Sequence, residues 1–551
     1  MKDLISVKIN GAVYQVPKGT SLEDIFRNEK IVMKHPILIA KVNNELKELD
    51  YKIMKNKEII PLDLSSKEGN RVLISGLVFV LYVAIKEIFG NNFDIVVDHS
   101  IDKGLYIETN FKINTEDILK IKNKMKEIIN ENRTIKRKII DKMDAIKYHE
   151  LNNDMSKKAN LRYNTSSYII MYKLGNYYNY FFTEMPMSTG VLGDFDLTYV
   201  DQNGLVLSFP TVYISDEVPV YHHHPNMFKV FKETKDWMKI MRLENSTDLN
   251  QLVSEGNIDQ IIRICENKQN YEIMNIAKEI VSNENRKIVM MAGPSSCGKT
   301  TSSKRLCMAL EALGKHPVVI AMDDYFVERD ETPLDEEGNK DYESLEAVDL
   351  KLLDKQMKAL VNGEKVLVPT YNFLTGSKEY KNEISLHDND IILIEGIHAL
   401  DSKILGNVKD DDVFKIYVSA LNELNIDSHN RISTTDNRLL RRIIRDNKTR
   451  GYDVTRTLEA WSKVRSGEEK YIFPFQDAAN YVLNTSLLYE LGVLKTYVEP
   501  LLFSVSEDSI YYAEAKRLIN FLKNFLPIPA DAIPSDSVLR EFIGGSCFKD
   551  E

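Results

Sequence analysis

Short runs of alternating apolar and polar side chains fill the first 63 residues. The alternation at residues 5–9 resumes at 12–16 after Asn10-Gly11, and a two-residue Asn-Gly between alternating runs is a strong hairpin signal. Residues 21–24 resemble a capping box and predict a helix start, and apolar runs between 37 and 62 predict further strands. This order of elements predicts a small β-grasp unit over residues 1–63.

The next region, from about 64 to 225, has a different pattern. Val72 to Phe89 is apolar enough for a buried helix, and residues 93–97 and 104–107 have the composition of strands. The stretch from Asn114 to Asp144, rich in Lys, Glu and Ile, predicts one long charged helix. We therefore expect an α+β unit.

From residue 285 to about 525 the pattern is typical of an α/β sheet. Four short apolar runs alternate with helical stretches, which predicts a parallel sheet covered by helices on both faces. A helical connector over 226–284 is expected before this unit, and a tail over 526–551 after it. The predicted strands are 287–292, 317–322, 390–394 and 413–418.

Composition places the chain among ordinary globular proteins. Its 551 residues carry a net charge of −10, which makes it a poor general binder of nucleic acids. Four scattered cysteines favour a reducing compartment, and the N-terminus resembles no targeting signal. The longest apolar run, Val72 to Ile85, is shorter than the ~20 residues that span a bilayer. We expect a cytoplasmic protein with no membrane partner.

A glycine-rich loop follows the first strand of the α/β unit. Gly293 to Thr300 has the form G-x-x-x-x-G-K-[ST], and a helical stretch, Thr301 to Leu313, comes next. Such a loop points its N–H groups at phosphate oxygens, and the helix N-terminus adds partial positive charge. Lys299 is expected to reach the outer phosphates, and the Thr300 hydroxyl to ligate Mg²⁺. The predicted ATP-binding residues of the loop are Gly293, Pro294, Ser295, Ser296, Cys297, Gly298, Lys299, Thr300 and Thr301.

Carboxylates end two of the other predicted strands. Asp323-Asp324 follows the run at 317–322, and Glu395 follows the run at 390–394. Ligands of parallel sheets bind beyond the carboxyl ends of the strands, so these side chains share the rim of the phosphate loop. Each carboxylate has a plain alternative, as a cap of the next element or a solvated strand end. The neighbouring loop favours a place in Mg-nucleotide chemistry.

An arginine-rich helix is predicted near residue 440. Arg438, Arg441, Arg442 and Arg445 recur at spacings of three and four and therefore share one broad helical face. Like charges stacked in this way are unfavourable unless an anion neutralises them. A solvated face or a nucleic-acid patch is the alternative, but a lid that clamps phosphates fits better.

Several ordered motifs join the phosphate loop between Lys287 and Phe525. They are Asp323-Asp324-Tyr325-Phe326, residues 341–349, Pro369-Thr370-Tyr371-Asn372-Phe373, Ile394-Glu395-Gly396-Ile397 and residues 441–446. Together they resemble the uridine kinase/phosphoribulokinase family of P-loop kinases. The resemblance implies phosphoryl transfer from ATP, with Mg²⁺, to the 5′-hydroxyl of a uridine- or cytidine-type nucleoside.

The resemblance also implies catalytic and metal-binding residues. Asp323 would be the general base that accepts the proton of the attacking hydroxyl, and Lys299 and Arg445 would be the other catalytic residues. Thr300 and Glu395 would hold Mg²⁺ directly or through water.

On the substrate side the resemblance leaves the nucleoside undefined. Three positions depart from the family pattern: Glu343 and Asn372 stand where Asp is usual, and Tyr452 stands where a basic residue is expected. Arg450 would contact the phosphates of ATP. The implied substrate-binding residues are Glu343, Tyr371, Phe373 and Arg442.

The N-terminal half resembles parts of threonyl-tRNA synthetases. Residues 1–63, with Val16 to Ser21 as the closest match, resemble a TGS domain, and residues 64–225 resemble the second additional domain. The editing site of that domain uses H-x-x-x-H on its first helix, but Arg71 to Leu77 contains no histidine. We therefore expect no editing activity, although RNA remains a candidate partner of this half.

Two other functions stay open. One is a kinase of another small hydroxylated metabolite, and the other is an RNA-binding regulatory protein that uses the phosphate loop as a nucleotide switch. Neither the oligomeric state nor a preference for ATP over GTP follows from the sequence.

Overall fold

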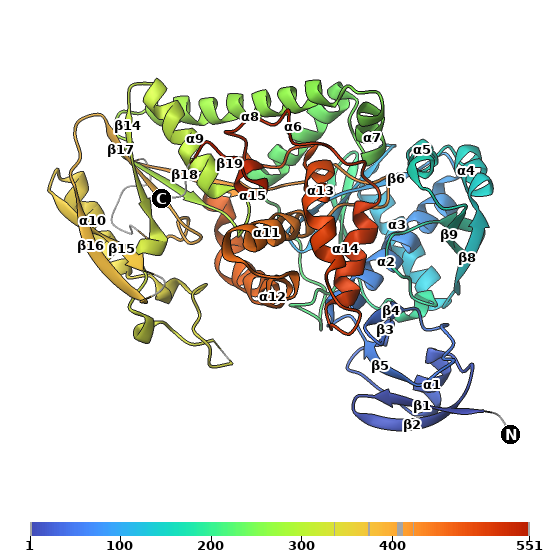
Figure 1. Cartoon of the computed structure of the whole chain (residues 1–551). Helices are drawn as coiled ribbons and strands as arrows, with labels where there is room; N and C mark the ends of the chain where they lie inside the picture. Colours follow the sequence, from blue (N-terminus) through green and yellow to red (C-terminus); the bar gives the residue numbers. More distant parts are fainter. Residues whose placement is uncertain (1–2, 336, 373–374, 405–411, 423, 549–551) are drawn as a thin grey trace.

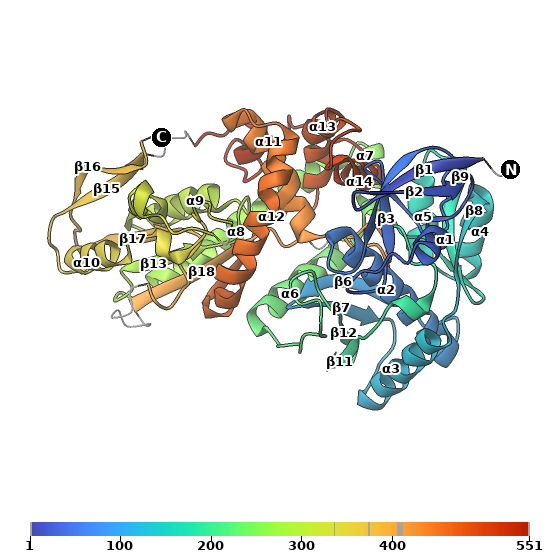
Figure 2. The ribbon, with the colours of Figure 1, turned by 90° about the horizontal axis from the view of Figure 1, so that it is seen from below.

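The computed structural model describes residues 3–335, 337–372, 375–404, 412–422 and 424–548. Figures 1 and 2 show the first sheet at one end of the molecule and the hairpin β15–β16 at the other. The helices between them belong to both halves of the chain.

The N-terminal unit is a five-stranded mixed sheet. Its strands run in the order β2-β1-β5-β3-β4, and β1 pairs in parallel with β5. The predicted hairpin and helix are confirmed, and the Ser21 hydroxyl caps the helix by accepting from the Asp24 amide at 3.1 Å. Membership of the TGS family stays a prediction. The elements are β1 (Leu4–Ile9), β2 (Ala12–Pro17), α1 (Leu22–Asn28), β3 (Ile39–Val42), β4 (Glu45–Lys47) and β5 (Lys57–Leu62).

The second unit packs two antiparallel sheets around a long apolar helix, α2 (Lys67–Phe89). The strand orders are β11-β12-β7-β6 and β10-β9-β8. The expectation of one helix from Asn114 to Asp144 is wrong, because α3 ends at Asn130 and β8 follows. The charged residues of β8 face solvent, so its sequence carries no continuous apolar face that would have marked a strand.

The elements that follow α2 in this second unit are strands in groups, separated by α3 and by the pair α4 and α5. They are β6 (Ile95–Ile101), β7 (Gly104–Thr109), α3 (Thr115–Asn130), β8 (Ile135–Asp141), α4 (Lys142–Leu151), α5 (Met155–Tyr163), β9 (Tyr168–Leu174), β10 (Tyr177–Asn179), β11 (Asp196–Asp201) and β12 (Gly204–Ser208).

Helix α2 extends beyond the apolar run seen in the sequence. By length and composition its 23 residues are enough to cross a membrane, which corrects the expectation that the run is too short. Most of the helix is nevertheless buried inside the protein, as in the core helix of a soluble unit. Length and composition therefore do not identify α2 as a membrane span.

The α/β unit contains the predicted parallel sheet. Its strand order is β14-β17-β13-β18-β19, and each neighbouring pair is parallel. The four predicted strands are confirmed, whereas β19 at the edge was not predicted. The strands are β13 (Ile288–Ala292), β14 (His316–Ala321), β17 (Asp390–Glu395), β18 (Val413–Ser419) and β19 (Tyr481–Asn484).

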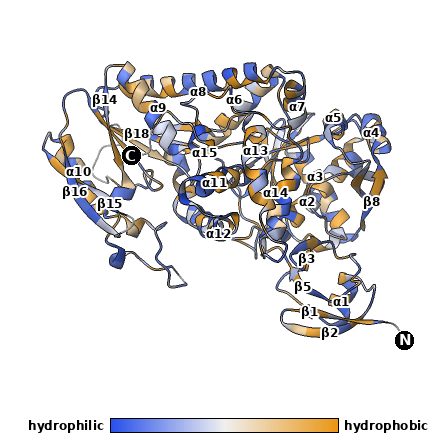
Figure 3. Cartoon of the chain, viewed as in Figure 1, coloured by the Kyte–Doolittle hydropathy of each residue, from blue (hydrophilic) through white to orange (hydrophobic). Residues whose placement is uncertain are grey.

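Helices cover both faces of this sheet, as expected. Helices α8 and α9 pack on one face, while α6 and α10 pack on the other. Figure 3 shows hydrophilic and hydrophobic residues alternating along α8, as its position between solvent and sheet requires. The connector helices are α6 (Pro225–Met241), α7 (Ser246–Ser254) and α8 (Ile258–Val281), and the unit adds α9 (Lys299–Ala312), α10 (Leu350–Val361) and the hairpin β15 (Val366–Asn372) with β16 (Ser377–Ile384).

A helical layer at the C-terminal end joins the α/β unit to the N-terminal half. Arg71 of α2 makes a bidentate ion pair with Glu514 of α14, at 2.7 and 2.9 Å. The tail folds back on this layer, and Phe542 near its end is fully buried. The helices are α11 (Thr434–Arg450), α12 (Val454–Tyr471), α13 (Glu490–Phe503), α14 (Tyr512–Leu522) and α15 (Arg540–Ile543).

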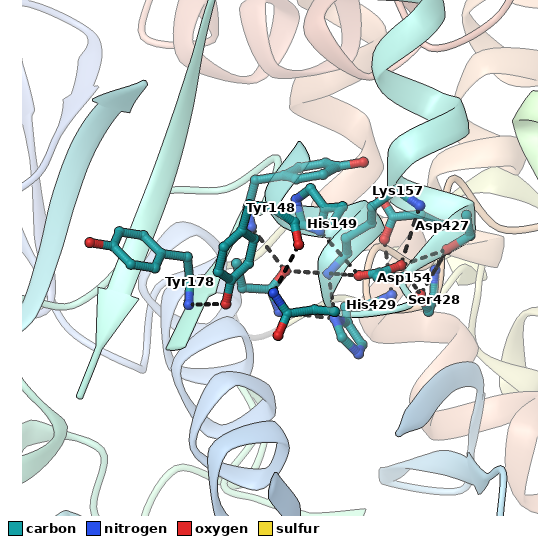
Figure 4. A network of polar contacts seen from close by, with 12 residues as sticks. Tyr148, His149, Asp154, Lys157, Tyr178, Asp427, Ser428 and His429 are labelled. Atoms are coloured by element: carbon teal, nitrogen blue, oxygen red, sulfur yellow. Dashed lines mark hydrogen bonds and ion pairs between the residues drawn. The ribbon is translucent and has the colours of Figure 1, made fainter. Parts of the chain in front are cut away.

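A buried polar network holds the two halves together at a second place (Figure 4). The fully buried Lys157 of α5 donates to Asn179 and contacts His429, and it lies 3.7 Å from the Asp154 carboxylate. Ser428 donates to Asp154 at 3.4 Å. Because buried ionic groups are costly unless they are paired, this network fixes the position of the N-terminal half.

Candidate active site

The phosphate loop lies between β13 and α9, at the carboxyl edge of the parallel sheet. Ser296 and Gly298 have φ angles of 59° and 87°. A Cβ atom on Gly293 would lie 2.0 Å from the carbonyl oxygen of Val418 in the neighbouring strand β18. Glycine at Gly293 therefore lets the loop approach the sheet, and glycine at Gly298 supplies the left-handed turn that starts α9.

Lys299 and Thr300 lie at the first turn of α9, where the sequence predicts the phosphates. The Lys299 ammonium donates to the carbonyl oxygens of Gly293 and Pro294, at 2.7 and 3.3 Å. The Thr300 hydroxyl donates to Glu395 at 3.1 Å. The loop lysine is thus held by its own loop, in position to exchange these carbonyls for phosphate oxygens.

Glu395, at the end of β17, anchors the opposite side of the loop. Its other carboxylate oxygen accepts from Ser303 at 2.7 Å. The Thr300 hydroxyl and the Glu395 carboxylate form the kind of small oxygen donor set that Mg²⁺ uses together with substrate phosphates and water. Among the described residues no group of three His, Cys, Asp or Glu is placed to hold a metal ion.

Asp323 and Asp324 follow β14 in a short turn and have different surroundings. Asp324 accepts a hydrogen bond from the Tyr371 amide at 3.0 Å, which anchors the hairpin β15–β16. Asp323 is exposed to solvent at the rim of the sheet. Nearby protein atoms still reduce the hydration of its carboxylate, which raises its pKa; Glu395 and Asp324 raise it further, and the positive charge of Lys299 opposes them. Asp324 therefore has a structural role, the plain alternative that the sequence allowed for either aspartate.

Glu343 lies against the backbone of α12 on the substrate side. Its Cβ is 2.9 Å from the place where a Cβ on Gly467 would lie, so only glycine allows this approach. Burial and the charge of Glu468 raise the pKa of Glu343 to about 7, while Arg442 and Lys299 oppose the rise. Glu343 therefore titrates near neutral pH and is near both cations.

The arginines of α11 separate into two groups. Arg442 donates to the Ser295 hydroxyl at 2.8 Å, and it shares the buried carboxylate of Asp446 with Arg445 and Arg450 at 3.1–3.2 Å. Arg442 therefore contacts the phosphate loop, and all three arginines have the Asp446 carboxylate as their present counter-ion.

Arg438 and Arg441 do not belong to such a lid, which corrects the expectation for the whole arginine face. Both side chains are buried; Arg438 pairs with Glu468 of α12 and Arg441 with Glu490 of α13. They also donate to the carbonyl oxygens of Ser295 and Cys297. These two arginines thus hold the outside of the phosphate loop.

Two carboxylates that the sequence did not single out contact loop amides. Glu468 accepts from the Ser295 amide at 3.1 Å. Glu541, in the tail helix α15, accepts from the amide and hydroxyl of Thr301 at 3.3 and 2.8 Å. Both occupy N–H groups of a loop built to receive anions. Glu541 is 240 residues from Thr301 in the sequence, so no local signal marked it.

The remaining predicted residues have less direct placements. Tyr371 is buried in β15, with its ring 5.7 Å from that of Phe326. Cys297 is fully buried, and burial raises the pKa of its thiol, which fits a packing residue. Phe373 lies outside the described residues.

The parallel sheet, the phosphate loop and the carboxylates on its rim are the features of a P-loop nucleotide-binding protein. A family model described as "Phosphoribulokinase / Uridine kinase family" matches residues 288–487. The "Uridine kinase" of Staphylococcus aureus strain JH9 is 31% identical over 197 residues, which cover 36% of this chain and 86% of that protein. The protein of strain Newman gives the same values.

The chain therefore belongs to the phosphoribulokinase/uridine kinase family, through its C-terminal region. Among solved structures, "Structure of a Possible Uridine Kinase from Bacillus stearothermophilus" covers 27% of this chain and 79% of that chain. The sequence identity is 24% and the TM-score 0.23, a similarity too low to support a structural argument.

Proposed function

We propose that this protein transfers the γ-phosphoryl group of ATP to the 5′-hydroxyl of a uridine- or cytidine-type nucleoside and so forms the nucleoside monophosphate. The observation that carries this proposal is the placement of Asp323. Asp323 lies two residues beyond Ala321, which pairs with Glu395 at the carboxyl edge of the parallel sheet, and Glu395 itself accepts from Thr300 of the phosphate loop at 3.1 Å. An acceptor hydroxyl at this rim would have a base beside the γ-phosphate site.

In the proposed mechanism the protein contributes mainly position and charge. Asp323 accepts the proton of the acceptor hydroxyl, and its raised pKa makes it a better base than an ordinary aspartate. Lys299 moves from its loop carbonyls to the phosphates, and Arg445 stabilises the charge that develops on the transferred group. Thr300 and Glu395 would hold Mg²⁺, which supplies further charge neutralisation at the phosphates.

Glu343 and Arg442 are proposed to bind the nucleoside. The positive charge of Arg442 favours the ionised form of Glu343. An ionised Glu343 can accept hydrogen bonds from sugar hydroxyls. Tyr371 belongs to the hairpin that Asp324 anchors next to the proposed base, which supports a place beside the substrate. RNA binding by the N-terminal half and a cytoplasmic location stay predictions.

The test is ADP release from Mg-ATP with uridine, cytidine and the purine nucleosides offered separately. We expect turnover with a pyrimidine nucleoside, and a loss of ~10²- to 10⁴-fold in kcat for Asp323→Asn. Asp324→Asn is the matched control, because an asparagine oxygen can still accept from the Tyr371 amide. Loss of activity only in Asp324→Asn would contradict the proposed base. If ATP is turned over with sugar phosphates or other hydroxylated metabolites but not with nucleosides, the acceptor is one of those metabolites and not a nucleoside.

A further inference from the structure

A cavity of about 520 Å³ lies between the N-terminal half and the C-terminal helices. One wall is formed by α2, which Figure 1 shows beside α14, and the opposite wall by α12 and α14. This volume is within the ~300–1,000 Å³ that is usual for sites of small organic molecules. The α2 wall lies outside residues 288–487, which the kinase-family model matches, so residues of both halves of the chain line this cavity.

Much of the cavity lining is apolar and aromatic. Trp461 of α12 and Phe521 of α14 face Ile74 and Val78 of α2 across it, and Phe181 adds another ring. Trp461 and Phe521 are themselves well buried, with exposed fractions of 5% and 7%. The two rings therefore form a fixed and mostly covered part of the apolar wall, and Arg438 and Arg442 lie over the Trp461 ring.

Most charged groups around the cavity are neutralised by the protein. Lys41 pairs with Glu68 at 2.7 Å, and Arg517 pairs with Asp436 at 2.7 Å and with Glu514 at 2.8 Å. Arg71 also pairs with Glu514. Every carboxylate among the lining residues is therefore already in an ion pair. The lining residues include more cations than anions.

Two cations of the lining are different. In the parts of the chain that the structure describes, neither Lys67 nor Arg431 has a carboxylate within the 4.0 Å of an ion pair, and Arg431 donates only to the Ile432 carbonyl, at 3.1 Å. Burial lowers the pKa of Lys67 and lowers that of Arg431 to about 10. The charges of Glu514 and Glu68 oppose this shift at Lys67, and those of Asp436 and Asp98 oppose it at Arg431, without forming an ion pair. Lys67 is exposed and Arg431 half-buried, and both side chains line the cavity.

We infer that this cavity binds a small organic anion, a flat apolar body that bears a phosphate or a carboxylate. The apolar body lies against Trp461 and the α2 side chains, and the anionic group neutralises Lys67 and Arg431. This site is separate from the phosphate loop, and the inference does not depend on the nucleoside kinase activity proposed above.

The probes for this test are 1-naphthyl phosphate and 1-naphthoate, with 1-naphthol as the neutral analogue and inorganic phosphate as the anion without a ring. Binding to the full chain is measured by isothermal titration calorimetry, in the presence of saturating Mg-ATP so that the phosphate loop is occupied. We expect one site per chain, with 1-naphthol and inorganic phosphate each bound at least 10-fold more weakly than the better naphthyl anion. Comparison of the phosphate with the carboxylate then identifies the preferred anionic group.

Variants connect that binding to the cavity. Lys67→Gln and Arg431→Gln should each weaken binding of the anion about 10-fold or more, while Lys41→Gln, a lining lysine that already has a partner, should change it less than 2-fold. Thermal melting of each variant checks that the chain is folded. Binding unaffected by Lys67→Gln and Arg431→Gln, equal binding of 1-naphthol, or no binding of either naphthyl anion would overturn the inference.

Discussion

The two faces of α11 use the same residue type for different purposes. Arg438 and Arg441 face inward and pair with carboxylates that α12 and α13 supply. Arg442 and Arg445 share Asp446, which belongs to their own helix, and Arg442 also donates to Ser295 of the phosphate loop. The inward pairs are almost fully buried, whereas the outward arginines keep 12% and 19% of their side chains exposed.

This difference shows how the protein keeps a dense cationic site folded before any nucleotide binds. The inward arginines are tied to fixed carboxylates, and they hold the carbonyl side of the loop through Ser295 and Cys297. The outward arginines share a local counter-ion that they can exchange for phosphate oxygens. Loss of an inward arginine should therefore affect folding, and loss of an outward one should affect chemistry.

The largest expected effect follows removal of an inward arginine. Arg441→Ala leaves the buried Glu490 carboxylate uncompensated, and we expect the free energy of unfolding to fall by about 3–5 kcal/mol, measured by urea titration. Arg445→Ala, measured in the same way, should change it by less than ~1 kcal/mol. Replacing the pair by Arg441→Met with Glu490→Leu should recover most of the loss. Equal destabilisation by Arg441→Ala and Arg445→Ala would remove the distinction between the two faces.

The next effect is on catalysis. Arg445→Ala should lower kcat by about 10²- to 10³-fold, equivalent to ~2.7–4 kcal/mol, because a cation that stabilises the transferred phosphoryl group is lost. KM for ATP should change much less, and the urea midpoint should stay near that of the unaltered protein. A rise in KM at unchanged kcat would instead mean that Arg445 serves only to bind ATP.

The arginine faces also show how much the sequence predicts. The phosphate loop, four of the five strands of the parallel sheet and the rim carboxylates follow from local patterns, because a G-x-x-x-x-G-K-[ST] loop after a short apolar run indicates a strand before it and a helix after it. The spacing of Arg438 to Arg445 identified a shared face but not its counter-ions. Those come from Glu468 and Glu490, 30 and 49 residues away, and only the tertiary fold brings them near.

The same limit explains the other misses. Strand β8 is largely solvent-exposed and rich in charged residues, so its sequence resembles that of the charged helix before it and was assigned to that helix. The cavity between the halves depends on packing of α2 against α12 and α14, which no motif records. Glu541 reaches Thr301 only because the tail folds back over α9.

A smaller effect is expected at Glu541, which contacts the start of α9 next to the phosphate loop. Its carboxylate accepts from the Thr301 amide at the N-terminus of α9, where a phosphate oxygen would otherwise accept. Glu541→Gln keeps an acceptor but removes the negative charge, so we expect a non-hydrolysable ATP analogue to bind about 5- to 10-fold more tightly, by roughly 1–1.4 kcal/mol. Asp531→Asn makes the same charge change at an exposed tail position and should leave affinity unaltered. Weaker binding by Glu541→Gln would mean that the carboxylate supports the nucleotide site.

The smallest effect concerns the charge that Arg442 places beside Glu343. Because the pKa of Glu343 is about 7, the ionised fraction rises as pH increases from 6 to 8, and the nucleoside KM should fall a few-fold over that range. Arg442 lowers this pKa by favouring the carboxylate, so Arg442→Ala should move the midpoint of the KM profile to higher pH. Glu343→Gln should flatten the profile. Arg441→Met with Glu490→Leu, on the inward face, should leave the midpoint where it is. A shift of equal size in that double variant would show that the inward and outward arginines act on Glu343 as one electrostatic group.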